Sequence, residues 1–414
     1  MDHRVRTIGA GDIDSWAQCM GVGFLYTVAE GYPQYLLGDV DLERTWGAFD
    51  GGRVVGTLRS FATAFTVPGP ATVGAAALTN VTVAPDHRRR GLLTEMITAD
   101  LRASAGRGEP VGILIASEYP IYGRFGYGAA VEGAAYSVDL ASTRFRRRGG
   151  GGGHQAGNGT VELVDLPTLR REAPALYERF RVAQPGSIER SARWWDRVLH
   201  QVEVPGANPP KGYRALYRSP QGVPEGYVRY GANQGWDSMR QTGELTVEEL
   251  VATTPAAYER LWRYCCEVDL VTTVRAGDRP VDEALPWLLE DGRTVRQTGR
   301  FDFLWVRVLD VVAALSARRY AVEGRLVVDV VDPLGFAGGR YALEGGPSGA
   351  ACARTEQAPD LTMPVEALGS MYLGGVSARI LRDTGYIDED TSGAIDRADV
   401  MFRSSTAPWC STWF

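Results

Sequence analysis

The sequence predicts a mixed α/β (α+β) fold that is divided into three domains. The chain has 414 residues, whereas a single domain usually contains about 100 to 200. Hydrophobic residues make up 44% of the chain and charged residues 23%, a balance typical of folded proteins with a sizeable core. Short apolar runs of strand length alternate with longer segments of helical periodicity, which indicates layers of strands and helices.

The first domain is expected over residues 1–148. Apolar runs that predict strands occupy 54–61, 75–83 and 111–116, and a helical pattern occupies 92–105. Residues 149–159 follow and include five consecutive glycines. Such a segment has few side chains with which to build a core, so we expect a flexible linker there.

The second domain is expected over residues 160–299 and the third over residues 300–414. In the second domain the patterns predict strands at 160–164, 213–218, 226–230 and 243–247, and helices at 168–181, 187–199 and 255–267. In the third they predict strands at 304–309, 324–331 and 341–344, and helices at 311–317 and 365–373.

Composition argues against several classes of protein. No run of about 18 uncharged apolar residues occurs, and residues 1–10 lack the apolar segment of a signal peptide, so we expect a cytoplasmic protein without a membrane span. The net charge of −6 disfavours nonspecific binding to nucleic acid. The five cysteines include no CxxC pair and accompany only four histidines, so no metal site is predicted.

The most informative segment runs from Leu78 to Leu93. It reads as a strand, a tight turn at Pro85 and Asp86, and the start of a helix, and it ends with Arg88, Arg89, Arg90, Gly91, Leu92 and Leu93. The first backbone N–H groups of a helix lack intrahelical partners, and the helix dipole is positive there, so phosphate oxygens bind well. A residue without a Cβ lets the chain approach a phosphate closely.

This segment resembles motif A of the GNAT N-acetyltransferases, whose pattern is Q/R-x-x-G-x-G/A. Arg88 and Gly91 match the pattern, and Leu93 departs from it by being larger. The resemblance implies that acetyl-coenzyme A is the co-substrate, with its pyrophosphate on the backbone of residues 88–93. The alternative is an ordinary strand-to-helix turn with a solvated arginine cluster. His87 is expected to face solvent, with a phosphate contact as the alternative.

The strand before the loop has a second expected task. Pantetheine contains amide groups, so exposed N–H and C=O groups over Val81, Thr82 and Val83 can pair with it as an added strand does. The acetyl group then lies beside Val81.

Residues 117–127 supply a second match, to the GNAT segment Y-x-x-x-G-F/Y. The resemblance implies that Tyr122 lies beside the thioester sulfur and acts as general acid. A thiol has a pKa of about 8.5 and a phenol of about 10, so a hydrogen bond to the developing thiolate is the larger effect. The alternative for Tyr122 is a core aromatic, the role expected of Phe125 and Tyr127.

The two matches together resemble the Eis (enhanced intracellular survival) acetyltransferases of actinobacteria, and the resemblance covers the whole chain. It implies an N-terminal GNAT domain, a central GNAT-like domain without the cofactor loop, and a C-terminal domain like a sterol carrier protein. It also implies a homo-oligomer, specifically a hexamer.

In that family a terminal carboxylate enters the N-terminal site as general base, which implies the same role for Phe414. Residues 406–414 contain three large aromatics and no charged side chain, whereas free tails tend to be polar. The alternative is that these aromatics only attach the tail to its own domain. A carboxylate is a weak base for an ammonium, so we expect it to position the amine and to relay the proton through water.

The acceptor is expected to be a small amine, such as an aminoglycoside-like compound, a lysine or another amine. Trp413 stands next to the last residue, and Glu30 is the one carboxylate of residues 21–35, which favours an acceptor of low positive charge. The expected function is an acetyl-coenzyme A-dependent N-acetyltransferase. The rival hypothesis is a catalytically vestigial protein that binds acyl-coenzyme A or lipid.

Overall fold

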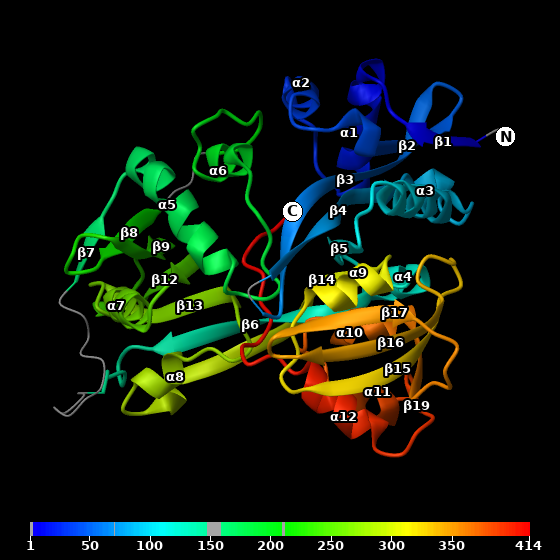
Figure 1. Ribbon diagram of the computed structural model, residues 1–414. Coiled ribbons are helices and arrows are strands. Elements are labelled where there is room, and N and C mark those ends of the chain that lie inside the picture. The colour runs from blue at the N-terminus through cyan, green and yellow to red at the C-terminus, as the bar shows by residue number, and fades with distance from the viewer. Residues whose placement is uncertain (1–2, 70, 147–158, 209–211) are drawn as a thin grey trace.

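The computed structural model describes residues 3–69, 71–146, 159–208 and 212–414. Of the predicted linker over 149–159, only Gly159 lies among the described residues. The fold is mixed α/β, as predicted, and consists of a twelve-stranded sheet, a five-stranded sheet and a small two-stranded hairpin in the described part of the chain. Figure 1 shows the first strands at upper right, the central strands at left and the third domain below.

The N-terminal part contributes the elements that surround the predicted cofactor loop. They are β1 (His3–Thr7), α1 (Ile13–Gly23), α2 (Tyr32–Leu37), β2 (Thr45–Asp50), β3 (Arg53–Val67), β4 (Ala71–Val83), α3 (Leu92–Gly106), β5 (Val111–Ile115), α4 (Tyr119–Tyr122) and β6 (Gly128–Asp139).

The central part contains β7 (Thr160–Leu163), α5 (Leu166–Arg181), α6 (Ala192–Val198), β8 (Tyr213–Arg218), β9 (Pro224–Asn233), β10 (Trp236–Asp237), β11 (Arg240–Gln241), β12 (Gly243–Ala252), α7 (Pro255–Cys266), β13 (Val271–Arg279), α8 (Leu285–Leu288) and β14 (Val295–Val308). The last part contains α9 (Val311–Ala317), β15 (Gly324–Val331), β16 (Gly339–Gly346), β17 (Gly349–Arg354), β18 (Leu361–Pro364), α10 (Val365–Met371), α11 (Ala378–Asp383), β19 (Asp388–Glu389) and α12 (Ala394–Phe402).

Every strand and helix that the periodicity predicted is present, although several ends differ and the predicted helix over 187–199 is wrong in its first part. Helix α6 begins only at Ala192, where the Ser191 side chain caps it by accepting a hydrogen bond from the Trp194 N–H. Residues 187–190 are extended instead, because their backbone bonds to β3: Thr66 N–H donates to Ser187 O, and Glu189 N–H donates to Ala64 O.

Strand β14 joins the two halves of the large sheet. The sheet order is β1-β2-β3-β4-β5-β14-β6-β13-β12-β9-β8-β7, so β14 lies between β5 and β6. It pairs antiparallel with β5 through Leu304–Val308 and with β6 through most of its length. The predicted start of the third domain, at residue 300, lies inside this strand.

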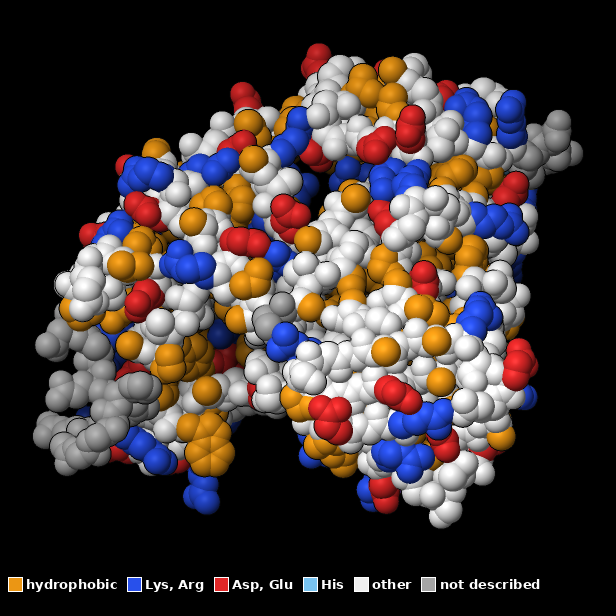
Figure 2. Space-filling view, viewed as in Figure 1, with side chains coloured by type: hydrophobic (Ala, Val, Ile, Leu, Met, Phe, Trp, Pro, Cys, Tyr) orange, Lys and Arg blue, Asp and Glu red, His pale blue; other side chains and the backbone are white. Residues whose placement is uncertain are grey.

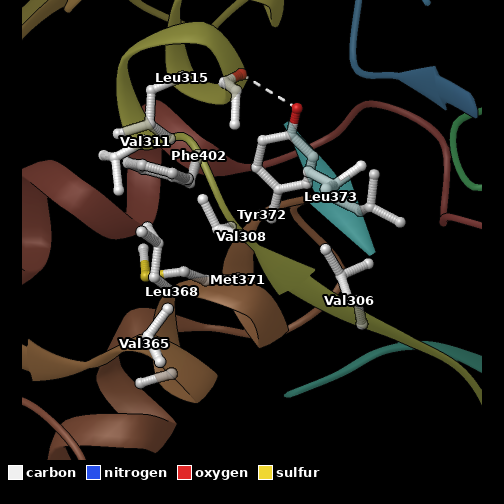
Figure 3. Packing of buried hydrophobic residues seen from close by; sticks show 14 of the residues in the cluster. Val306, Val308, Val311, Leu315, Val365, Leu368, Met371, Tyr372, Leu373 and Phe402 are labelled. Carbon is white, nitrogen blue, oxygen red and sulfur yellow. Dashed lines mark hydrogen bonds between the residues drawn. The ribbon is translucent and has the colours of Figure 1, made fainter. Parts of the chain in front are cut away.

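The third domain has an interior filled by its own side chains. Figure 3 shows apolar residues of β14, α9, α10 and α12 in direct contact there, and the Tyr372 hydroxyl donates a hydrogen bond to the Ala314 carbonyl 3.0 Å away. Phe402, Leu315 and Leu368 are almost completely buried in this cluster. No helix in the described ranges has the length and apolar character needed to cross a membrane.

Candidate active site

Strand β4 separates from β5 about halfway along the length of β4. They pair in parallel only where Ala75–Leu78 meets Val111–Leu114, and β4 then continues alone on that side as far as Val83. The other edge of β4 stays bonded to β3, with a register shift opposite Asn80, whose φ is +54°. The segment 79–83 therefore has a strand edge that is open to a ligand, which is the geometry that the pantetheine hypothesis requires.

The predicted loop follows directly. A short 3₁₀ helix, η3 (Pro85–His87), takes the place of the expected tight turn, and Gly91 caps the N-terminus of α3 with φ +82°. This left-handed conformation favours glycine. A Cβ on Gly91 would have no protein atom within 4 Å, so the backbone here is open to an approaching group.

A pocket of about 930 Å³ combines the open strand edge with this loop. It is lined by Gly23, Phe24, Val81, Thr82, Val83, Pro85, His87, Arg88, Arg89, Arg90, Gly91, Leu92, Leu93, Thr94, Ser117, Glu118, Ile121, Tyr122 and Arg124. Ten of the eleven predicted site residues line the pocket, and Phe414 is the exception. No described residue of the second domain is among those that line it.

The arginines of the loop are exposed. Arg88 approaches the Glu118 carboxylate at 3.5 Å, with both side chains more than half exposed, and Arg90 donates to the Asp86 carbonyl oxygen at 2.9 Å. Arg89 has a φ of +64°, an unusual conformation for a residue with a side chain. Together these guanidinium groups give the mouth of the pocket a positive charge that suits phosphates.

The expectation that His87 faces solvent is wrong. Its side chain is 6% exposed, and its two ring nitrogens lie 2.9 Å from carboxylate oxygens of Asp50 and Asp86. The hydrogen bond with Asp50, followed by that with Asp86, raises the pKa of His87. Helix η3 turns the His87 ring inward, and the hydrogen bond of the ring with Asp50 therefore ties the loop to β2.

Tyr122 lies at the end of α4 and is 7% exposed. Its ring meets that of Tyr127 edge to face at a centroid distance of 6.2 Å, and its hydroxyl makes no hydrogen bond within the described part of the chain. Burial, with a smaller contribution from Glu118, raises the pKa of Tyr122 to about 12. The phenol is therefore neutral at physiological pH and keeps its proton available for a hydrogen bond.

The C-terminal tail leaves the third domain and runs between the first and second domains, where the C label stands beside β3 in Figure 1. Trp409 N–H donates to the Pro185 carbonyl at 2.8 Å, and Trp409 is only 4% exposed. The Trp413 indole donates to Asp278 of β13 at 2.9 Å, although its ring is 56% exposed. The tail is thus bound to the second domain as well as to its own.

Phe414 ends the tail against the first domain. Its ring meets Phe61 of β3 at a centroid distance of 5.5 Å. Phe61 stands opposite Ala77 in the pairing of β3 with β4, one residue before the point where β4 and β5 separate. Phe414 is not among the residues that line the large pocket; its ring packs on β3 instead.

Comparison with known proteins agrees with this architecture. Models of acetyltransferase (GNAT) domains match residues 4–130 and 186–308, and a sterol carrier protein domain model matches residues 311–411. The N-acetyltransferase Eis of Mycobacterium tuberculosis is 37% identical over 361 residues, which cover 86% of this chain and 85% of Eis. The chain belongs to the Eis family of N-acetyltransferases.

Two further proteins are similar over the whole length. An uncharacterized N-acetyltransferase of Streptomyces avermitilis is 42% identical over 416 residues, covering 100% of this chain and 99% of that protein. The crystal structure of Eis1 from Mycobacterium abscessus superposes with a TM-score of 0.85 at 33% identity and covers 100% of both chains. The protein is therefore an acyltransferase with two GNAT domains and a sterol-carrier-like domain, and its family uses acetyl-coenzyme A.

Arg190 holds the tail of this Eis-family chain, a contact that sequence reasoning missed. Its guanidinium, inaccessible to solvent, donates to Thr412 Oγ1 at 2.9 Å and to the Ser411 carbonyl at 2.9 Å, and it pairs with Glu249 at 2.6 Å. Its carbon atom CZ lies 3.8 Å from the ring centroid of Tyr177. Burial alone would lower the pKa of Arg190, but the Glu249 carboxylate raises it. Arg190 thus holds the tail as a permanent cation.

The contact of Phe61 in β3 with Phe414 was also missed, since nothing in a strand pattern shows which face of the strand meets the C-terminal residue. Among the described residues, no group of three or more His, Cys, Asp and Glu side chains is arranged to hold a metal ion.

Proposed function

We propose that the protein transfers the acetyl group of acetyl-coenzyme A directly to a small amine at the open edge of β4. The observation that supports this best is the 930 Å³ pocket, which combines the unpaired edge over 79–83, the α3 N-terminus and Tyr122. In this proposal the backbone of Val81, Thr82 and Val83 holds pantetheine. The pyrophosphate lies on residues 88–93, where the backbone N–H groups and arginines attract it.

Each residue has a defined role in the proposed reaction. The α-carboxylate of Phe414 positions the ammonium, which loses one proton to water and becomes the free amine. The amine nitrogen attacks the thioester carbonyl, a C–N bond forms, and the C–S bond breaks to leave a thiolate. The Tyr122 hydroxyl donates a hydrogen bond to that thiolate, and the proton that the acylated nitrogen loses ends on the sulfur. The products are an acetamide and coenzyme A.

The acceptor class is proposed from the family and the surroundings of the tail. Aminoglycoside-like compounds, lysine and other small amines all carry a suitable nucleophile. Glu30 is the one carboxylate of residues 21–35, and Trp413 stands beside the last residue, which favours a small and weakly charged amine.

A steady-state assay of thiol release from acetyl-coenzyme A, across a panel of amines, tests the proposal. Mass spectrometry of the acceptor must show a gain of one acetyl group. Thiol release that does not depend on any amine would overturn it and favour the rival hypothesis of a vestigial acyl-coenzyme A- or lipid-binding protein.

We also propose that the protein is a homo-oligomer, specifically a hexamer, because it belongs to the Eis family. Light scattering at micromolar concentration checks this. A mass near the 45.0 kDa of one chain would overturn it.

A further inference from the structure

The segment that carries Tyr122 has few bonds of its own. It consists of α4, the 3₁₀ helix η4 (Gly123–Phe125) and Gly126, whose φ is +79°. No side chain caps α4, and the backbone is held by single hydrogen bonds, from Gly126 N–H to Gly123 O at 2.9 Å and from Tyr127 N–H to Tyr122 O at 3.3 Å. One turn of helix is not stable by itself, so the position of the Tyr122 hydroxyl depends on what packs against this segment.

Strand β14 and the third domain pack directly against the end of this segment. A Cβ on Gly126 would lie 2.6 Å from Val365 Cγ1 of α10 and 2.8 Å from the guanidinium carbon of Arg307 in β14, so both side chains contact the Gly126 backbone. A Cβ on Gly128 would overlap the Glu366 carbonyl of α10. Figure 1 shows α4 at the boundary of the first and third domains. Figure 2 shows this boundary as a continuous surface, whereas a notch separates the lower ends of the second and third domains.

Arg307 is held against Gly126 by a buried ion pair. Its side chain is inaccessible to solvent, and its Nη2 donates to the two carboxylate oxygens of Asp332 at 2.8 and 2.7 Å. Its Nη1 donates to the Val308 carbonyl at 3.1 Å. Asp332 directly follows β15 in the third domain, and its side chain is 1% exposed. A buried ion pair is weak evidence for stability, but its hydrogen bonds give the guanidinium one fixed position.

The same carboxylate folds the loop between β15 and β16. It accepts hydrogen bonds from the backbone N–H groups of Leu334, Phe336 and Ala337, at 3.1, 2.9 and 2.8 Å. The side chains of Leu334 and Phe336 then pack against the apolar cluster that includes Tyr122. Asp332 therefore maintains two contacts with the surroundings of Tyr122, one through the arginine that contacts Gly126 and one through its own loop.

We propose that Asp332 is a positioning residue for acetyl transfer, and that through Arg307 and the loop over 332–337 it holds the Tyr122 hydroxyl at the thioester sulfur. This inference rests on the proposed function, in which that hydroxyl donates a hydrogen bond to the departing thiolate. Such a bond weakens steeply when its geometry changes, and a displacement of about 1 Å can cost about 10²-fold in rate. The third domain then has a task in the reaction of the first.

A double-mutant cycle of Asp332→Asn with Tyr122→Phe tests the inference. Asp332→Asn removes the charge with little change in shape. It should lower kcat by about ten-fold or more and change KM for acetyl-coenzyme A by less than about two-fold, because none of the contacts above involves residues 88–93. In the Tyr122→Phe background the same substitution should lower kcat by less than about a further two-fold, because no hydroxyl is left to position.

Two further variants separate positioning from general stability. Asp329→Asn breaks a more exposed ion pair with Arg340, three residues earlier in the chain, and should leave kcat within about two-fold of the wild type. Phe336→Leu keeps the hydrogen bonds of Asp332 but replaces the ring that packs against the cluster. It should lower kcat, again with little further effect in the Tyr122→Phe background. Urea unfolding gives the folded fraction to which each kcat is referred.

Asp332→Asn leaves a buried arginine without its carboxylate, so Phe336→Leu decides if that variant does not fold. The inference is overturned if the deciding variant keeps the wild-type kcat, or if its effect multiplies with that of Tyr122→Phe, as the effects of independent sites do. Full kcat in Tyr122→Phe alone would instead overturn the role of Tyr122 in the proposed function, and this inference with it.

Discussion

The rings of Phe414 and Phe61 meet edge to face, 5.5 Å apart at an interplanar angle of 87°. This contact joins the last residue of the sequence to a strand of the first domain. Edge-to-face aromatic pairs contribute about 0.5–1.5 kcal/mol beyond their buried area. The position of the α-carboxylate is therefore set by packing in the first domain as well as by the hydrogen bonds that hold residues 407–413.

An extension of a few residues after Phe414 should lower kcat by ten-fold or more. It moves the carboxylate and forces the tail to bulge, and transfer depends on reacting atoms held about 3–3.5 Å apart. The affinity for acetyl-coenzyme A should stay the same, because residues 88–93 lie outside the tail. A tag at the N-terminus, which Figure 1 shows at the far side of β1, is the control. Equal turnover of the two tagged forms would remove Phe414 from the mechanism.

Tyr122→Phe should lower kcat by about 10²-fold, the lower range for general acid catalysis, with little change in the affinity for acetyl-coenzyme A. The ring is retained, so packing against Tyr127 should persist. Tyr119→Phe is the matched control in the same short helix, because Tyr119 is 63% exposed. Full kcat in the Tyr122 variant, with chemistry rate-limiting, would show that Tyr122 only packs.

The pH dependence follows from the same residue. Burial raises the pKa of Tyr122 to about 12, so the protonated form that donates the hydrogen bond is lost only as pH rises through that value. At saturating substrate, kcat should show no decline from tyrosine ionisation between about pH 9 and 11, where an ordinary tyrosine of pKa about 10 ionises. A fall centred near pH 10 in the wild type that is absent in Tyr122→Phe would contradict this.

Gly91→Glu should abolish acetyl-coenzyme A binding in calorimetry. The φ of +82° disfavours any side chain, and a carboxylate at the α3 N-terminus competes with and repels the pyrophosphate. Gly106→Glu, at the other end of α3 and with open space around its Cβ, should bind as the wild type does. Unchanged affinity in the Gly91 variant would mean that the loop does not bind the cofactor.

Arg190→Met should destabilise the protein and release the tail. Removing one partner of a buried ion pair costs about 3–5 kcal/mol, and the hydrogen bonds to Ser411 and Thr412 are lost with it. Urea unfolding and proteolysis of the tail measure the two effects. Arg170→Met breaks a more exposed pair with Asp196 and should cost less than about 1 kcal/mol. Similar stability losses in both variants would contradict the role of Arg190.

Local signals predicted much of the fold, and non-local contacts account for what they missed. The loop before α3 and the strand over 324–331 carry their patterns within a few residues, so both were found. Strand β6 is rich in Gly and Ala, which have weak strand preference, and it forms because β14 and β13 pair with its two edges. Residues 187–190 read as helical, and only their bonds to β3 keep them extended.

The same distinction applies to the site. The arginine loop and Tyr122 were recognisable because each lies in a short motif whose spacing reflects its contacts. Phe61 and Arg190 lie far apart in the sequence, and each contacts the tail only because the first two domains pack around it. No pattern of neighbouring residues records that arrangement.

The place of β14 between β5 and β6 has a consequence for biosynthesis. The edge of β5 can find its partner only after residues 304–308 have left the ribosome, which at about 5–20 residues per second is on the order of tens of seconds after β5 itself. Until then the nascent first domain exposes an unpaired and strongly apolar strand edge. A chain stalled before β14 should therefore be a chaperone substrate, and the first domain should not be expressed as a separate fragment.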